Sequence, residues 1–103
     1  MNQNSVAIRE LGSDRWELAG ELTRDTVAGL WEQRQRICCG NGEISISLRH
    51  LGHVDSAGLA FLVALRACHA HQGRDLRFIE APQQLMRLVE ASGLMRVVPI
   101  VAE

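Results

Sequence analysis

The stretch HVDSAGLAFLVALR, residues 53–66, holds the side chains that first suggest chemistry. Ser56 stands two residues before Gly58, as the nucleophile of a hydrolase elbow does, but Val54 replaces the other glycine of that motif. Spacing pairs no histidine and acid with Ser56, and the glycine-rich motifs that hold phosphate are absent from the sequence. The sequence therefore predicts a protein that is not an enzyme and that needs no cofactor.

The four histidines form two pairs, His50 with His53 and His69 with His71. A zinc site needs three or four converging ligands. These pairs are expected at the two ends of one helix, about 20 Å apart at a rise of 1.5 Å per residue. We therefore expect solvated surface histidines and no metal site.

Asp55 and Ser56 mark the start of that helix, because a short side-chain oxygen can accept a bond from a free backbone N–H. Ser56 is expected to act as a cap and as an interface hydroxyl. The nine residues from Ala57 to Leu65 include no polar side chain, whereas a surface helix normally has a polar face. At 100° per residue they form two apolar arcs. The bulkier arc is expected to face a sheet: Phe61, Leu62, Leu65 and Cys68.

The second arc is mostly small and contains Leu59, Ala60, Val63, Ala64 and Ala67. One interpretation is a helix enclosed by its neighbours. The other, which we favour, is a protein contact, because exposed apolar patches with polar rims mark interfaces. The predicted partner-binding residues are His53, Asp55, Ser56, Leu59, Ala60 and Val63, with Leu59 and Val63 as anchors.

The elements around this helix predict one α/β domain over residues 1–103. Alternation and turn signals give the order β-β-α-β-α-β-α-β, and strands that alternate with helices favour a small mixed sheet with helices mainly on one face. The clearest strand is EISISL, residues 43–48, with its apolar side chains on one side. Thr23 is expected to cap a helix that ends at residues 40–42, and Gly93 with Leu94 should close the last helix.

The charges are balanced, with Lys+Arg 11 against Asp+Glu 12 and a formal net charge of −1. This balance does not favour nucleic-acid or membrane-surface binding. The first ten residues lack the pattern of a signal peptide, and the longest apolar run is too short to insert in a bilayer. A cytoplasmic protein is expected.

The stretch SISLRHLGHVDSAGL, residues 45–59, resembles the motif of STAS domains, in which a strand and a short loop lead to Asp-Ser, a small residue, Gly and Leu at a helix start. Gly20-Glu21-Leu22-Thr23 resembles the Gly-Glu-Leu-Asp step of that family. The sequences AGELT and LWEQR, the latter at residues 30–34, most resemble the small cytoplasmic STAS subunits of the MlaB type. These belong to ABC transporters that move phospholipid and maintain outer-membrane lipid asymmetry in Gram-negative bacteria.

The resemblance implies a STAS fold over nearly the whole chain and a non-enzymatic subunit. Its implied partners are the ATPase subunit and, through it, an inner-membrane permease, which would place the protein in the cytoplasm beside the inner membrane. The alternative is an anti-sigma factor antagonist switched by phosphorylation at Ser56. Ser47 stands where many of those relatives carry Asp, which weighs against the switch, and the sequence around Trp31 favours the transporter subunit.

Overall fold

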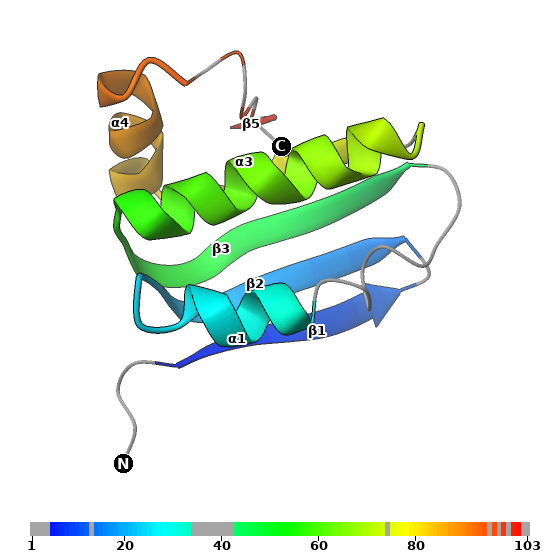
Figure 1. The fold of residues 1–103 in the computed structure, drawn as a ribbon, viewed down its shortest axis with the longest axis horizontal. Helices are drawn as coiled ribbons and strands as arrows, with labels where there is room; N and C mark the ends of the chain where they lie inside the picture. Colours follow the sequence, from blue (N-terminus) through cyan, green and yellow to red (C-terminus); the bar gives the residue numbers. More distant parts are fainter. Residues whose placement is uncertain are drawn as a thin grey trace.

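The chain alternates strands and helices in the order predicted from its sequence (Figure 1). The computed structural model describes residues 5–12, 14–33, 43–73, 75–94, 96, 98 and 100–101. The predicted helix end at residues 40–42 lies outside this part of the chain. The elements are β1 (Val6–Gly12), β2 (Arg15–Leu22), α1 (Val27–Glu32), β3 (Ile44–Val54), α3 (Ser56–His71), β4 (Leu76–Ile79), α4 (Gln83–Ala91) and β5 (Ile100–Val101).

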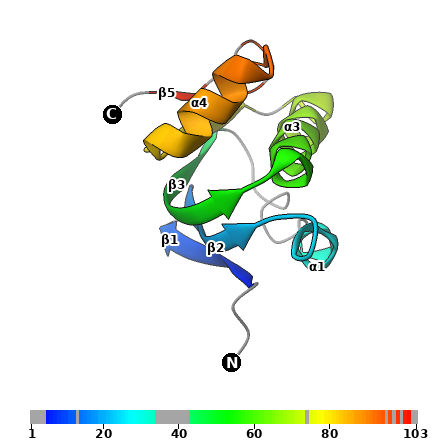
Figure 2. The ribbon, with the colours of Figure 1, turned by 90° about the vertical axis from the view of Figure 1, so that its left-hand side faces the viewer.

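The five strands form one sheet in the order β1-β2-β3-β4-β5. β1 runs antiparallel to β2, and the pairs from β2 to β5 are parallel. Right-handed crossovers between strands that advance in one direction place their helices on one face of the sheet. Figure 2 shows α1 and α3 on the same side of the sheet, with α4 across the end where β5 lies. The predicted mixed α/β fold is confirmed.

The core lies between the sheet and the helices. Ile44, Ile46 and Leu48 are buried on the helix side of β3, as the alternation predicts. Beyond Leu48 the strand continues to Val54, and two shifts in the β2–β3 register occur along it. These shifts interrupt the alternation of buried and exposed side chains. The sequence pattern therefore did not predict the second half of the strand, although Val54 is buried there.

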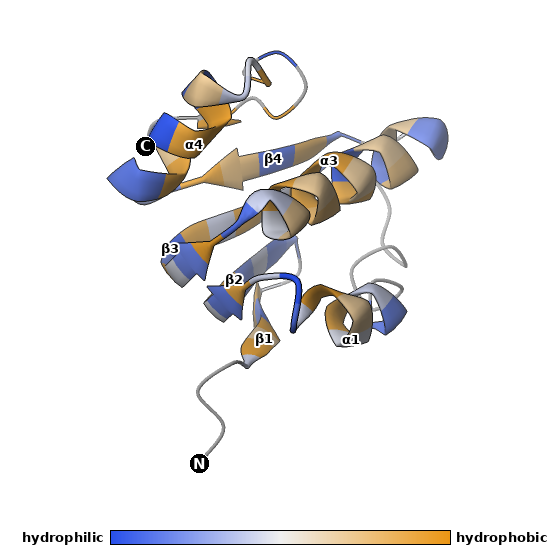
Figure 3. Ribbon diagram, turned by 60° about the vertical axis from the view of Figure 1, so that its left-hand side comes forward, coloured by the Kyte–Doolittle hydropathy of each residue, from blue (hydrophilic) through white to orange (hydrophobic). Residues whose placement is uncertain are grey.

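The other face of the sheet carries polar side chains. The Glu17 carboxylate is largely buried there, 3.6 Å from the Arg9 guanidinium and 3.4 Å from His50 Nε2. The Ser47 hydroxyl donates to the Glu80 carboxylate at 2.9 Å. Glu80 has φ +58°, a left-handed conformation that is uncommon for a residue with a side chain. The helix side of the sheet is therefore the apolar side, and Figure 3 shows apolar colour along most of α3.

The start of α1 differs from the sequence prediction, whereas the end of α4 agrees with it. α1 does not start at Thr23: the chain first makes a turn in which the Thr23 carbonyl accepts from Thr26 and Val27 at 2.9 Å, and Thr26 is the N-cap. The prediction that Thr23 caps the helix itself is therefore wrong, but the Thr23 hydroxyl accepts the Asp25 N–H at 3.3 Å and so caps the turn that precedes α1. α4 ends as predicted, because Gly93 has φ +69° and Leu94 N–H donates to the Val89 carbonyl, the pattern of a Schellman motif. Within the described residues, no helix has the length and apolarity to cross a membrane.

Candidate functional site

Asp55 joins the end of β3 to the start of α3. Its carboxylate accepts the N–H of Gly58 at 2.9 Å, so Asp55 is the N-cap of the helix. The other carboxylate oxygen accepts the N–H of Arg24, on the loop between β2 and α1, at 3.0 Å. Asp55 therefore fixes where α1 begins relative to α3.

Hydrogen bonds to the charged form of Asp55 lower the pKa of its carboxyl from the ordinary value of 3.8. The Arg24 N–H is the largest cause, and the N–H groups of Gly58 and Ala57 act in the same direction. The nearby His53 lowers the pKa further through its charge, while partial burial opposes these effects. At neutral pH the carboxylate is ionised and held by the fold.

Glu21 plays a similar part at the end of β2. Its carboxylate accepts the His53 N–H at 2.7 Å, which ties the last residues of β3 to β2. The His53 side chain remains exposed. His53 and Asp55 thus lie together at the carboxyl edge of the sheet, the edge at which open α/β sheets usually bind ligands.

Gly58 allows α3 to approach β2 closely. A Cβ at this position would overlap the Leu22 carbonyl oxygen. The backbone of the first helical turn therefore lies directly against the end of β2. This contact explains the glycine of the Asp-Ser-Ala-Gly-Leu stretch on packing grounds.

Ser56 is the first residue of α3 and is exposed. The expectation that Ser56 caps the helix is wrong, because the neighbouring Asp55 adopts the extended backbone of a cap and makes the capping bond. Both residue types are good caps, so the sequence did not distinguish them. The Ser56 hydroxyl remains at the protein surface.

The predicted contact residues on α3 do not all lie on one face. Ala60 is exposed, and Val63 is partly buried against the core. Leu59 is 2% exposed and belongs to the core, so its predicted role as a partner anchor is wrong. Leu59 lies three residues before Leu62, only about 60° away around a helix, and therefore shares its buried side. We call Ser56, Ala60 and Val63 the α3 surface.

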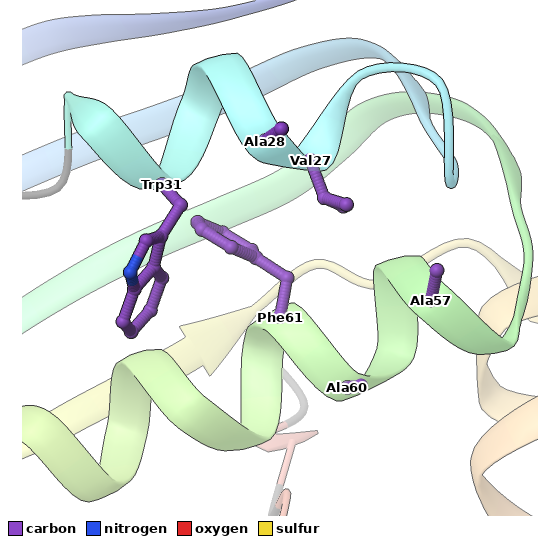
Figure 4. A pocket seen from close by; sticks show the side chains of 6 residues that line it. All are labelled: Val27, Ala28, Trp31, Ala57, Ala60 and Phe61. Carbon is purple, nitrogen blue, oxygen red and sulfur yellow. The ribbon is translucent and has the colours of Figure 1, made fainter.

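An apolar groove lies beside the α3 surface, between α1 and α3 (Figure 4). It has a volume of about 330 Å³ and is lined by Val27, Ala28, Trp31, Ala57, Ala60 and Phe61. The rings of Trp31 and Phe61 meet edge to face, with centroids 5.9 Å apart at an angle of 85°. Sequence analysis missed the α1 side of this groove. The available signal was the spacing of Val27, Ala28 and Trp31, which repeats on one side of a helix.

The histidines are placed differently from the prediction at one position. His50, His53 and His71 are exposed, but His69 is fully buried, with Nδ1 3.0 Å from the Leu65 carbonyl oxygen. The expectation of a solvated His69 is wrong because it shares the buried side of α3. Within the described residues, no three His, Cys, Asp or Glu side chains gather as metal ligands. The side chains lining the groove carry no ionisable group, so this site is built for apolar contact.

Comparisons with known proteins place the chain in a family. The family model described as the MlaB STAS domain matches residues 7–101. The chain is also 34% identical over 82 residues to the intermembrane phospholipid transport system binding protein MlaB of Haemophilus influenzae. That alignment covers 75% of this chain and 77% of the relative.

Proposed function

Because the chain belongs to the MlaB-type STAS domain family, we propose that it is a non-enzymatic subunit of an ABC transporter for phospholipid. In this proposal it binds the cytoplasmic ATPase subunit and supports its assembly and activity. The ATPase subunit connects it to the inner-membrane permease, so the protein works in the cytoplasm at the inner membrane. Its contribution to the cell is the maintenance of outer-membrane lipid asymmetry.

The observation that carries this proposal is the α3 surface, with its exposed Ser56 and Ala60, next to an apolar groove. Ser56 and Ala60 are exposed on the first two turns of α3, and their small side chains allow the backbone of a partner to approach closely. The adjoining groove offers an apolar cavity that contact with a protein would remove from water. The shape and apolarity of this surface suit contact with another protein.

Asp55 and His53 serve this surface in different ways. The Asp55 carboxylate already accepts two backbone N–H groups, so its role is to position α3 and α1. His53 has an exposed side chain three residues before Ser56 and can contact the partner at the rim. Val63 contributes from the far end of the surface, but its packing against the core limits its use as a deep anchor.

The alternative function is that of an anti-sigma factor antagonist controlled by phosphorylation of Ser56. The observation in its favour is the exposed Ser56 hydroxyl at the first position of a 16-residue helix. A phosphate there would meet the positive end of the helix dipole and would be tolerated by the fold. It would also place close to two negative charges beside the apolar groove and disrupt an apolar contact.

The experiment measures binding of the purified ATPase subunit from the same transport system by titration calorimetry. The wild-type chain is expected to bind. Ala60→Glu should weaken binding by more than about tenfold, because a desolvated, unpaired carboxylate opposes an apolar contact. Ala70→Glu is the matched control on the exposed side of the last turn of α3, and it should change the affinity less than about twofold.

Val63→Asp is not a clean test, because the side chain also packs against the core. Ser56→Glu should release the ATPase subunit while the fold persists. Failure of the wild-type chain to bind the ATPase subunit, together with binding to a serine kinase that phosphorylates Ser56, would replace the transporter proposal with the alternative.

A further inference from the structure

The groove between α1 and α3 has chemical features that restrict what can occupy it. Its volume of about 330 Å³ is near the lower end of the about 300–1,000 Å³ that small-molecule pockets span. Figure 4 shows the Trp31 and Phe61 rings together toward one end, with Ala57 of α3 facing Val27 of α1 toward the other. The alanines keep the opening wide, and the rings and Val27 form apolar walls. One large apolar side chain fits this space better than the two acyl chains of a phospholipid.

The rim of the groove is acidic on the α1 side. Glu32 is exposed and follows Ala28 by four residues, which places the two on the same side of α1. Asp25 is exposed on the turn that leads into α1. Arg24 on the same turn is also exposed, and its backbone N–H donates to the Asp55 carboxylate near the start of α3. Counted over the described residues 24–33 alone, this side of the groove carries two carboxylates and one guanidinium, a net charge of −1.

The α3 side of the groove carries no Asp, Glu, Lys or Arg. The residues that follow Ser56 along this side of the helix are Ala60, Ala64 and Ala67, at helical spacing. A partner surface that matches both sides would carry a basic residue toward α1 and a small or apolar backbone toward α3. The same acidic rim would repel the phosphate of an anionic lipid headgroup.

We propose that the α1–α3 groove receives a basic amphipathic helix of the partner protein, with one large aliphatic or aromatic side chain in the groove. A Lys or Arg about one turn from that side chain would lie near Glu32 or Asp25. This inference rests on the proposed function and names the partner chemistry at the same site. It assigns the groove to a protein helix and not to a lipid chain.

The test uses the full chain and the ATPase subunit in titration calorimetry. Ala60→Leu fills the groove from within, and we expect it to weaken binding about tenfold, because an extra side chain cannot share a closely packed cavity. Ala70→Leu is the matched control and should bind as the wild type. Glu32→Arg should weaken binding about fivefold at low salt and less at high salt, because a rim charge acts over a screened distance. Glu90→Arg on the exposed side of α4 is its control.

The outcomes separate this inference from the proposed function. No binding by the wild-type chain would overturn the proposed function itself. Wild-type affinity for both Ala60→Leu and Glu32→Arg, with binding still lost in Ser56→Glu, would leave the function standing and overturn the groove assignment. Phosphatidylglycerol vesicles test whether the groove binds lipid instead. If the wild-type chain binds these vesicles and Ala60→Leu does not, the groove belongs to lipid and the proposal is contradicted.

Discussion

Replacing Asp55 should loosen the junction that holds α1 and α3 together. Asp55→Ala removes the N-cap bond to Gly58, which costs about 1 kcal/mol. It also removes the bond to the Arg24 N–H, and because that bond is exposed its loss costs about 0.5–1 kcal/mol. The sum is about 2 kcal/mol of unfolding free energy, or about 8–16 °C in Tm for a domain of this size.

Asp55→Asn separates the two contributions. Asparagine is as good an N-cap as aspartate, so the bond to Gly58 persists. Its amide nitrogen cannot accept from Arg24, and we expect about 0.5–1 kcal/mol of destabilisation from that loss. Urea denaturation of wild type and both variants at pH 7 measures these differences.

The pH dependence has a definite sign. Because the folded-state pKa of Asp55 lies below its ordinary 3.8, the charged carboxylate stabilises the fold at pH values above 3.8. That contribution is lost as the pH falls through the folded pKa. The stability advantage of wild type over Asp55→Asn should therefore shrink in acid below pH 3.8. Two results would refute the assigned role of the carboxylate. One is equal stability of wild type and Asp55→Ala at pH 7. The other is a stability difference between wild type and Asp55→Asn that stays the same in acid.

Three further predictions concern stability in the same denaturation assay. Gly58→Ala should cost about 2 kcal/mol or more, because its Cβ overlaps the Leu22 carbonyl; a neutral change would show that α3 can move away from β2. Ser56→Ala should stay within about 0.5 kcal/mol of wild type, since Asp55 makes the cap, and a loss of about 1 kcal/mol would return the cap to Ser56. Ser47→Ala should lower the free energy of unfolding by about 1 kcal/mol, because it removes the hydrogen bond to Glu80. Glu80→Gly should lower it less, because glycine relieves the positive φ and so offsets the lost bond. A larger loss for Glu80→Gly than for Ser47→Ala would contradict this reasoning.

Sequence patterns predicted the fold where one local rule dominates. The alternation of Ile44, Ile46 and Leu48 identified the central strand, because one face of that strand is polar and the other is buried. Gly93 and Leu94 identified a helix end, because few residues other than glycine adopt a left-handed backbone easily. The resemblance of residues 45–59 to the STAS motif indicated the family that the comparisons then showed.

Sequence patterns failed where neighbours in space decide the outcome. α3 is apolar on most sides, so its sequence alone did not show whether Leu59 faced the core or a partner. The burial of His69 depends on the same orientation. The groove combines residues from α1 and α3, two helices separated by the whole of β3, and only the folded arrangement brings Trp31 and Phe61 together.

Hydrogen exchange of the chain, alone and in complex with the ATPase subunit, tests the central claim most directly. Backbone N–H groups at the exposed ends of helices exchange readily, because these ends open locally, unless another surface covers them. The proposed contact predicts new protection over residues 55–60 at the start of α3 and over residues 27–32 of α1. Protection confined to the β1–β2 hairpin or to the polar face of the sheet would contradict the account and place the partner elsewhere.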